Sequence, residues 1–338
     1  MPRILHHGFH RLPQAAIIIG RVVLLVVGLA PGFVATSRLG AEDPPTPEDS
    51  YPRIFIGKPD GSEMKPLVDL DEYKSQGSPT WSQDGKAIAF DAWRPEIGET
   101  HVNAKVVVVN ADGSNPRILG EGAMPSFSPR RNRIAISRYA PNQGVWIMSG
   151  EGPERELALL DPEGWGADWS PDGKQIVYAV YNANAANLVV CDLIEGVRVS
   201  LFEAGKSPYS SFFWNFAWSP DGRKIAFKGQ RTDGKIEIGI VDARGAKDGL
   251  VTRYEGDVTP NVAWSHDSKQ ILFSRATPER MNRVQLYVMD ASTKDPPQLL
   301  AGQDPERANV TAAFSPDGKS LLVASRKPPV KKGAKKSP

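Results

Sequence analysis

The sequence is poor in the residues that build disulfides, metal sites and common catalytic centres. It has a single cysteine, Cys191, and only two histidines beyond residue 41, His101 and His266. One cysteine excludes an intrachain disulfide, and two histidines far apart in the sequence do not supply the ligands of a zinc site. The chain also lacks the Gly-x-Ser-x-Gly motif that carries the nucleophile of α/β-hydrolases. We therefore expect no metal, no cofactor and no enzymatic activity.

An excess of positive charge is absent from the body of the chain. Residues 1–41 and 326–338 hold four and six basic residues and no acidic ones, which leaves 31 basic against 39 acidic residues between them. An acidic body argues against a nucleic acid as partner, because phosphate contacts need a basic patch. The basic residues 327–338 are expected to form a disordered tail.

The first 41 residues have the three zones of a secretory signal. A basic start is followed by an apolar run over Ala15–Ala30 and by small residues up to Ala41. Arg21 interrupts the run, and the uninterrupted part, Val22–Ala30, is too short to cross a bilayer. We expect export to the periplasm or cell envelope with cleavage after Ala41. An uncleaved anchor that contacts the membrane, or a wrongly assigned start, are the alternatives. Residues 42–52 are expected to be an extended linker.

A sixfold internal repeat fills the rest of the chain. Its signature is an aromatic residue followed by Ser-Pro-Asp-Gly-Lys or a variant, as in Trp218-Ser-Pro-Asp-Gly-Arg. Apolar residues alternate with small or polar ones around the turn, which predicts two antiparallel strands joined tightly. The six aromatic residues are Trp81, Phe127, Trp169, Trp218, Trp264 and Phe314. An apolar residue lies nine positions after each of them: Phe90, Ile136, Tyr178, Phe227, Phe273 and Val323.

A second predicted hairpin follows each of the first five copies. Four strands per unit of about 46 residues is typical of a β-propeller blade. The sixth copy lacks a second hairpin, whereas residues 53–68 resemble strands without a signature before them. We expect residues 53–68 to supply the outer strands of one blade and residues 311–325 its inner strands, which closes the ring and covers two sheet edges. The predicted fold is an all-β, six-bladed propeller of four-stranded antiparallel blades over residues 53–326.

The repeating aromatic residues and the Asp-Gly pairs are expected to be structural. An aromatic side chain that recurs at one place in every unit is expected to pack between blades rather than to bind a ligand. The Asp-Gly pairs, such as Asp172-Gly173, are expected to form turns, because no loop carries the dense oxygen ligands of a calcium site.

The repeat resembles that of the TolB-type β-propeller, which Trp169-Ser-Pro-Asp-Gly-Lys and Tyr287-Val-Met-Asp-Ala match closely. The resemblance covers residues 53–326 and implies an exported propeller that docks a protein or a carbohydrate on one face. TolB proteins carry an additional α/β domain before the propeller, for which residues 42–52 leave no room. The resemblance therefore favours a binding or scaffolding role in the envelope over the role of TolB itself.

Binding is expected on one rim of the propeller. Loops between the second and third strands of each blade share this rim with the blade-to-blade connections, and the Asp-Gly turns lie opposite. The rim collects arginine and aromatic residues, which dominate binding hot spots, although each could also be a solvated loop residue or a local salt-bridge partner. The candidate binding residues are Trp93, Arg94, His101, Arg138, Tyr139, Tyr181, Tyr209, Phe213, Trp214, Arg231, Arg275 and Arg326.

Two classes of function make different demands on the structure. A monomeric binding module for an envelope protein or a carbohydrate would present exposed aromatic and arginine side chains on the rim. A propeller hydrolase or lyase acting on carbohydrate would instead gather carboxylates and histidine around the central channel.

Overall fold

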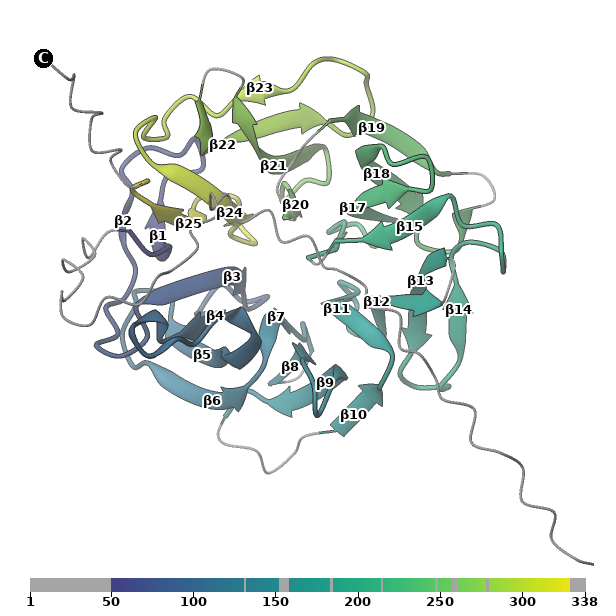
Figure 1. The fold of residues 1–338 in the computed structure, drawn as a ribbon, viewed down its shortest axis with the longest axis horizontal. Coiled ribbons are helices and arrows are strands. Elements are labelled where there is room, and N and C mark those ends of the chain that lie inside the picture. Colours follow the sequence, from purple (N-terminus) through teal and green to yellow (C-terminus); the bar gives the residue numbers. More distant parts are fainter. Residues whose placement is uncertain are drawn as a thin grey trace, which may run out of the picture. The chain divides into compact units, whose positions relative to one another are not determined.

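The computed structural model describes residues 50–328 except 131, 152–157, 183–184, 214, 247–248, 257–260 and 278–279. The expected signal segment, most of the linker and nearly all of the basic tail lie outside the described residues. Six antiparallel sheets form a ring, as Figure 1 shows. The prediction of an all-β, six-bladed propeller is confirmed. No helix over the described part of residues 50–328 is long and apolar enough to cross a bilayer.

Each blade is numbered after the copy of the repeat that forms its inner strands. From the inner to the outer strand, blade 1 consists of β3 (Ser75–Trp81), β4 (Ala87–Trp93), β5 (Lys105–Asn110) and β6 (Arg117–Glu121), and blade 2 of β7 (Ala123–Phe127), β8 (Arg133–Arg138), β9 (Gly144–Ser149) and β10 (Ala158–Asp161). In the same order, blade 3 consists of β11 (Gly164–Trp169), β12 (Gln175–Asn182), β13 (Ala185–Asp192) and β14 (Arg198–Ser200), and blade 4 of β15 (Tyr209–Phe212) with β16 (Ala217–Trp218), then β17 (Lys224–Arg231), β18 (Ile236–Asp242) and β19 (Val251–Glu255). Blade 5 consists of β20 (Val262–Trp264), β21 (Gln270–Thr277), β22 (Arg280–Asp290) and β23 (Gln298–Leu299), and blade 6 of β24 (Ala308–Phe314), β25 (Leu321–Arg326), β1 (Arg53–Gly57) and β2 (Lys65–Pro66).

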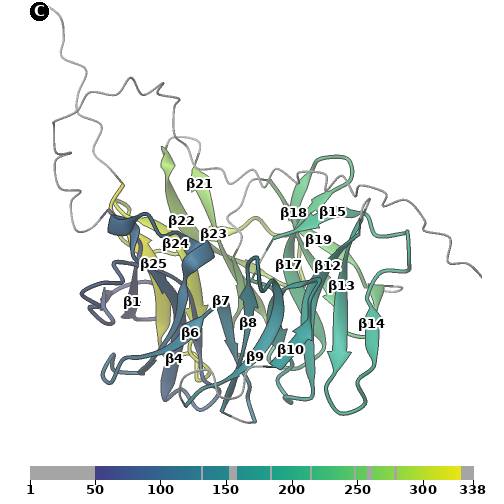
Figure 2. The ribbon, with the colours of Figure 1, turned by 60° about the horizontal axis from the view of Figure 1, so that its bottom comes forward.

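The strands run between two faces of the ring (Figure 2). We call the face with the first-to-second-strand turns the turn face, and the opposite face, with the second-to-third-strand connections, the loop face. The β4–β5 connection on the loop face contains two 3-10 turns, η1 (Pro95–Ile97) and η2 (His101–Asn103). Antiparallel pairing places these two kinds of connection at opposite strand ends, as the sequence predicts.

Blade 6 joins the two ends of the propeller. Strand β1 pairs antiparallel with β25, with Ile54 opposite Ala324 and Phe55 opposite Val323. The backbone N–H of Ile54 also donates a 2.9 Å hydrogen bond to the side-chain oxygen of Gln76 in blade 1. The predicted closure, with inner strands from the C-terminal part and outer strands from the N-terminal part, is confirmed.

Six apolar clusters form the core, one at each interface between neighbouring blades. Every cluster contains one aromatic residue of the repeat signature and the apolar residue nine positions later. At the interface of blades 6 and 1, these are Trp81 and Phe90, which pack with Ile54 and Leu322 of blade 6. The repeat therefore encodes the packing of each blade against the preceding one.

Five of the six turns on the turn face share one set of hydrogen bonds. In blade 3, the Ser170 hydroxyl donates to Asp172 Oδ1 at 2.7 Å, and the same carboxylate oxygen accepts the N–H of Lys174 at 3.1 Å. Blades 1, 4, 5 and 6 repeat this pattern. Blade 2 has Pro129-Arg-Arg-Asn132 at this place and lacks the aspartate. The carboxylates thus stabilise the turns from within.

We predict that Ile54→Ala in β1 destabilises the whole propeller. The side chain is fully buried at the closing interface, so its truncation leaves a cavity that should cost about 2–5 kcal/mol. Chemical denaturation measures this loss. Ile194→Ala is the matched control, because Ile194 is 74% exposed, and it should change stability by less than about 0.5 kcal/mol. Equal effects of the two substitutions would contradict the closure.

Candidate functional site

Aromatic side chains of blades 1, 2 and 3 form a continuous row on the loop face. Trp93 ends β4, His101 lies in η2, and Tyr139 directly follows β8. Ring centroids are 6.4 Å apart between Trp93 and His101 and 5.6 Å between His101 and Tyr139, and both pairs meet edge to face. Trp165 in β11 extends the row, with its ring 4.6 Å from that of Tyr139. We call these four residues the aromatic row.

The propeller framework determines where these rings lie. The N–H of Gly166 donates to the Ser137 hydroxyl at 2.9 Å, which joins β11 to β8 and places Trp165 beside Tyr139. In the β4–β5 connection, the Thr100 hydroxyl accepts the N–H of Val102 at 3.3 Å and caps η2. The rings are therefore positioned by hydrogen bonds of the adjoining backbone.

The aromatic row is uncharged near neutral pH. Burial lowers the pKa of His101 below its usual value, so its imidazole is neutral. Burial, together with the charge of Asp91, raises the pKa of Tyr139 above its usual value, so its hydroxyl stays protonated. The N–H of Met124 donates to the Asp91 carboxylate at 2.8 Å. A neutral surface of this kind suits an apolar contact.

Two exposed apolar side chains adjoin the row in sequence, and sequence reasoning missed them. Ile97 is 66% exposed and Val102 is 45% exposed, and both belong to the β4–β5 connection that carries His101. Trp165 was also missed, because it precedes the signature residue Trp169 by four positions and resembles part of the repeating core. The available signal was the spacing, because Trp214, which is among the candidate residues, also lies four positions before its signature residue, Trp218.

Two predicted arginines belong to the same sector of the loop face and have local partners. Arg94 donates from Nη2 to Glu99 at 2.6 Å and lies over the ring of Tyr73, with 5.5 Å to its centroid. Arg138 donates from Nε to the Glu121 carbonyl at 3.0 Å and stacks over Trp146. Both guanidinium groups are thus held in place by local contacts.

The other predicted arginines lie in blades 4, 5 and 6 and are not part of the aromatic row. Arg231 Nη1 lies 3.7 Å from the buried Glu237 carboxylate, and Arg275 donates to the Tyr254 hydroxyl at 2.6 Å. Arg326 is the last residue of β25. These positions share the loop face but form no cluster with blades 1 to 3.

The predicted aromatic insertion of blade 4 is largely interior. Tyr209 is fully buried in β15 and its hydroxyl donates to Glu237 at 2.5 Å, so its expected exposure on the rim is wrong. Phe213 is half-buried, with the Lys228 ammonium 4.2 Å from its ring centroid. Tyr181 is 40% exposed and its hydroxyl donates to the Phe212 carbonyl. Trp214 lies outside the described residues.

The central channel contains a cavity of about 260 Å³ that opens toward the turn face. The six signature aromatic residues and their neighbours in sequence line it, and Asp168 and His266 are the titratable side chains in the described lining. Burial raises the pKa of Asp168 to about 6. Its carboxylate accepts the Ser126 hydroxyl at 2.8 Å and the Trp218 N–H at 2.7 Å, and so links blades 2, 3 and 4. Over the described residues, no three His, Cys, Asp or Glu side chains are arranged to hold a metal ion.

We predict that Asp168 makes the propeller more stable as the pH falls from about 6 to about 4. Its pKa of about 6 lies above the usual aspartate value of about 3.9, so the folded state binds the proton first. Over this interval the free energy of unfolding should rise on the order of 2 kcal/mol relative to Asp168→Asn. Denaturation of both proteins across the pH range measures the difference. A wild-type protein that loses stability relative to the variant would overturn this assignment.

Solved structures of other proteins share the architecture. A putative TolB from Agrobacterium tumefaciens has 19% sequence identity, with 83% of this chain and 99% of that chain covered and a TM-score of 0.62. TolB from Acinetobacter baumannii has 17% identity, with 83% and 65% covered and a TM-score of 0.56. Hydrazine synthase from Kuenenia stuttgartiensis has 14% identity, with 72% of each chain covered and a TM-score of 0.51. At these identities the likeness shows the fold alone.

The sequence itself identifies the family. No curated protein matches the chain closely enough to serve as a relative. The sequence model of the TolB beta propeller domain matches residues 159–335, which is just over half of the 338 residues. The matched segment begins in blade 2 and includes the signature residues of blades 3 to 6. The chain therefore belongs to the TolB beta propeller domain family.

Proposed function

We propose that this chain is an exported, non-catalytic propeller that binds a protein partner in the cell envelope through the loop face of blades 1 to 3. The observation that carries the proposal is the aromatic row, which crosses three blades without interruption from Trp93 to Trp165. Envelope export is proposed from the signal-like residues 1–41 and from membership of the TolB family.

The chemistry of this surface matches that of binding hot spots. Tryptophan, tyrosine and arginine are the residue types enriched there, and they act best where the surrounding contacts exclude water. The aromatic row supplies neutral rings, and the exposed Ile97 and Val102 add apolar area. Arg94 and Arg138, held by their local partners, offer oriented donors at the edge. A partner with an apolar patch bordered by acidic groups would be complementary.

Catalysis on carbohydrate is the second candidate, and one observation favours it. Asp168 faces a cavity and has a raised pKa, which is a property of general acids. Its two carboxylate oxygens, however, already join three blades through hydrogen bonds. Because that arrangement serves the framework, we favour the binding module over the hydrolase or lyase.

We predict that the loop face alone captures the partner. The immobilised chain should retain a protein from envelope extract, and the double substitution Trp93→Ala with Trp165→Ala should weaken capture at least about tenfold, as expected for two hot-spot residues. Binding is followed by quantitative pull-down and then by titration with the purified partner.

A matched pair of isoleucine substitutions locates the surface. Ile97→Asp should abolish capture, whereas Ile194→Asp should not, because Ile194 is at least as exposed but follows the β13 strand of blade 3 on the turn face. Capture that survives both aromatic substitutions and Ile97→Asp would sink the proposal. Cleavage of a polysaccharide without capture of any protein would favour the enzyme instead.

A further inference from the structure

A second cavity, of about 370 Å³, lies on blade 6 and is separate from both the aromatic row and the central channel. One wall is the face of β1 and β25, and the other is the connection from blade 5 to blade 6 over residues 300–307. The connection is held over the blade by a 2.9 Å hydrogen bond from the Gly302 N–H to the Asp60 carbonyl. We call this cavity the closing-blade cleft. Its volume is in the range of small-molecule sites.

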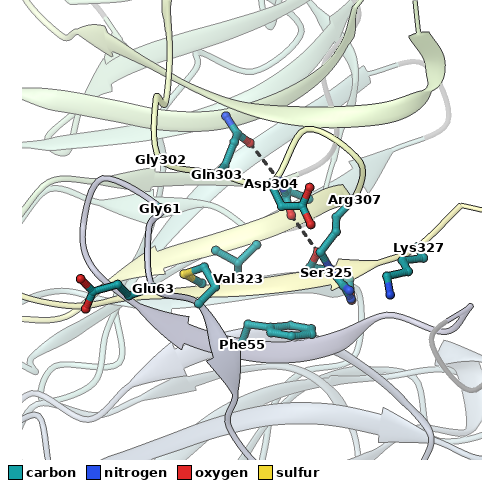
Figure 3. A pocket seen from close by; sticks show the side chains of 12 residues that line it. Phe55, Gly61, Glu63, Gly302, Gln303, Asp304, Arg307, Val323, Ser325 and Lys327 are labelled. Atoms are coloured by element: carbon teal, nitrogen blue, oxygen red, sulfur yellow. Dashed lines mark hydrogen bonds between the residues drawn. The ribbon is translucent and has the colours of Figure 1, made fainter.

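The floor of the cleft is apolar. Phe55, Met64 and Val323 line it, and Val323 belongs to the core cluster between blades 5 and 6. Figure 3 shows Phe55 and Val323 between Glu63 at one end and Lys327 at the other. An apolar group of a ligand would be removed from water here.

One side of the cleft is a connected polar wall. Gln303 is fixed to blade 5, since its side-chain oxygen accepts the Leu286 N–H at 2.8 Å and also accepts from Asn309 at 3.0 Å. The Ser325 hydroxyl donates to Asn309 Oδ1 at 2.7 Å and accepts from Arg307 Nε at 2.9 Å. Gln303, Asn309 and Ser325 are all buried, so this wall is rigid.

Arg307 ends the polar wall at the cleft. Its guanidinium stacks over Phe55, with 4.4 Å to the ring centroid, and Nη2 lies 3.3 Å from the Ser325 carbonyl. A guanidinium has five N–H groups in one plane and recognises carboxylates through them. An arginine oriented by stacking and by a fixed wall loses little conformational freedom on binding an anion.

The charged residues that line the Arg307 end of the cleft suit a ligand with a single negative charge. Lys327 adds a second positive charge to the lining, and Asp304 adds one negative charge, with its Oδ1 accepting the Glu306 N–H at 2.8 Å. At the other end, Glu63 is paired with Lys58. Two basic residues and one acidic residue thus line the end that holds Arg307, next to an apolar floor.

We propose that the closing-blade cleft binds a small monocarboxylate with an apolar tail, of the kind represented by a medium-chain fatty acid. The carboxylate lies against Arg307 and Lys327, and the tail lies over Phe55, Met64 and Val323. The proposal is independent of protein binding on the loop face, because the two sites share no residue.

Octanoate is the probe for this site. Its binding to the full chain is measured by isothermal titration calorimetry and by broadening of the octanoate NMR signals. Octanoate should bind, whereas acetate, which lacks the tail, and 1-octanol, which lacks the charge, should each bind at least about tenfold more weakly. Failure of octanoate to bind at concentrations of roughly 1–10 mM would overturn the proposal.

Two substitutions should weaken octanoate binding, and a third should tighten it. Arg307→Met keeps a side chain over Phe55 but removes the charge, and should weaken binding at least about tenfold. Met64→Trp fills the floor and should also weaken it. Asp304→Asn removes the repelling charge while keeping an acceptor for Glu306, and should tighten binding about threefold.

Arg244→Met is the matched control, because Arg244 is exposed in blade 4 and pairs with Asp242; it should bind octanoate like the wild type. If Arg307→Met does not fold, Lys327→Met takes its place, since Lys327 is exposed. The assignment is contradicted if two variants bind octanoate as tightly as the wild type does. These variants are Asp304→Asn and whichever of Arg307→Met and Lys327→Met is used.

Discussion

Packing between neighbouring blades is the constraint on which the rest of this structure depends. A four-stranded blade has two apolar faces and cannot bury either one alone, so each blade is stable only between its neighbours. The repeat supplies the same pair of side chains to every interface: a signature aromatic residue and an apolar residue nine positions later. An open ring would leave two of these faces in water. Strand β1 prevents this by completing blade 6.

The same framework fixes the candidate binding surfaces. The aromatic row crosses blades 1 to 3, and its rings lie close together because bonds such as that from Gly166 to Ser137 hold adjacent blades in register. The closing-blade cleft arises where the chain passes from blade 5 to the composite blade 6. Both surfaces thus lie where the blades differ from one another.

The fold could be predicted from the sequence because its determinants are local and repeated. Three features can be read from the sequence alone: strand alternation, the Ser-Pro-Asp-Gly turn and the terminal strands that lack a partner in their own repeat. Together they predict six blades and the closure of the ring. The candidate site could be predicted only in part. Trp93, His101 and Tyr139 meet in the structure, but their contacts join three blades, and spacing along the chain does not encode such contacts.

The failures have physical causes of the same kind. Tyr209 resembles an exposed rim aromatic, yet Gly229 leaves the space into which its ring packs beside Phe227. Trp165 was missed for a related reason, because its contact with Tyr139 joins two blades. Neither neighbour is visible until the strands are in register.

The central claim is that the N-terminal strand is an integral part of one cooperative ring. Native-state amide hydrogen exchange, read by mass spectrometry over residues 53–57, tests it most directly. The account predicts that these amides exchange as slowly as those of the inner strands β4, β17 and β25, because β1 opens only when the ring opens. Exchange of β1 as fast as that of a frayed edge strand, with the other blades still protected, would contradict it.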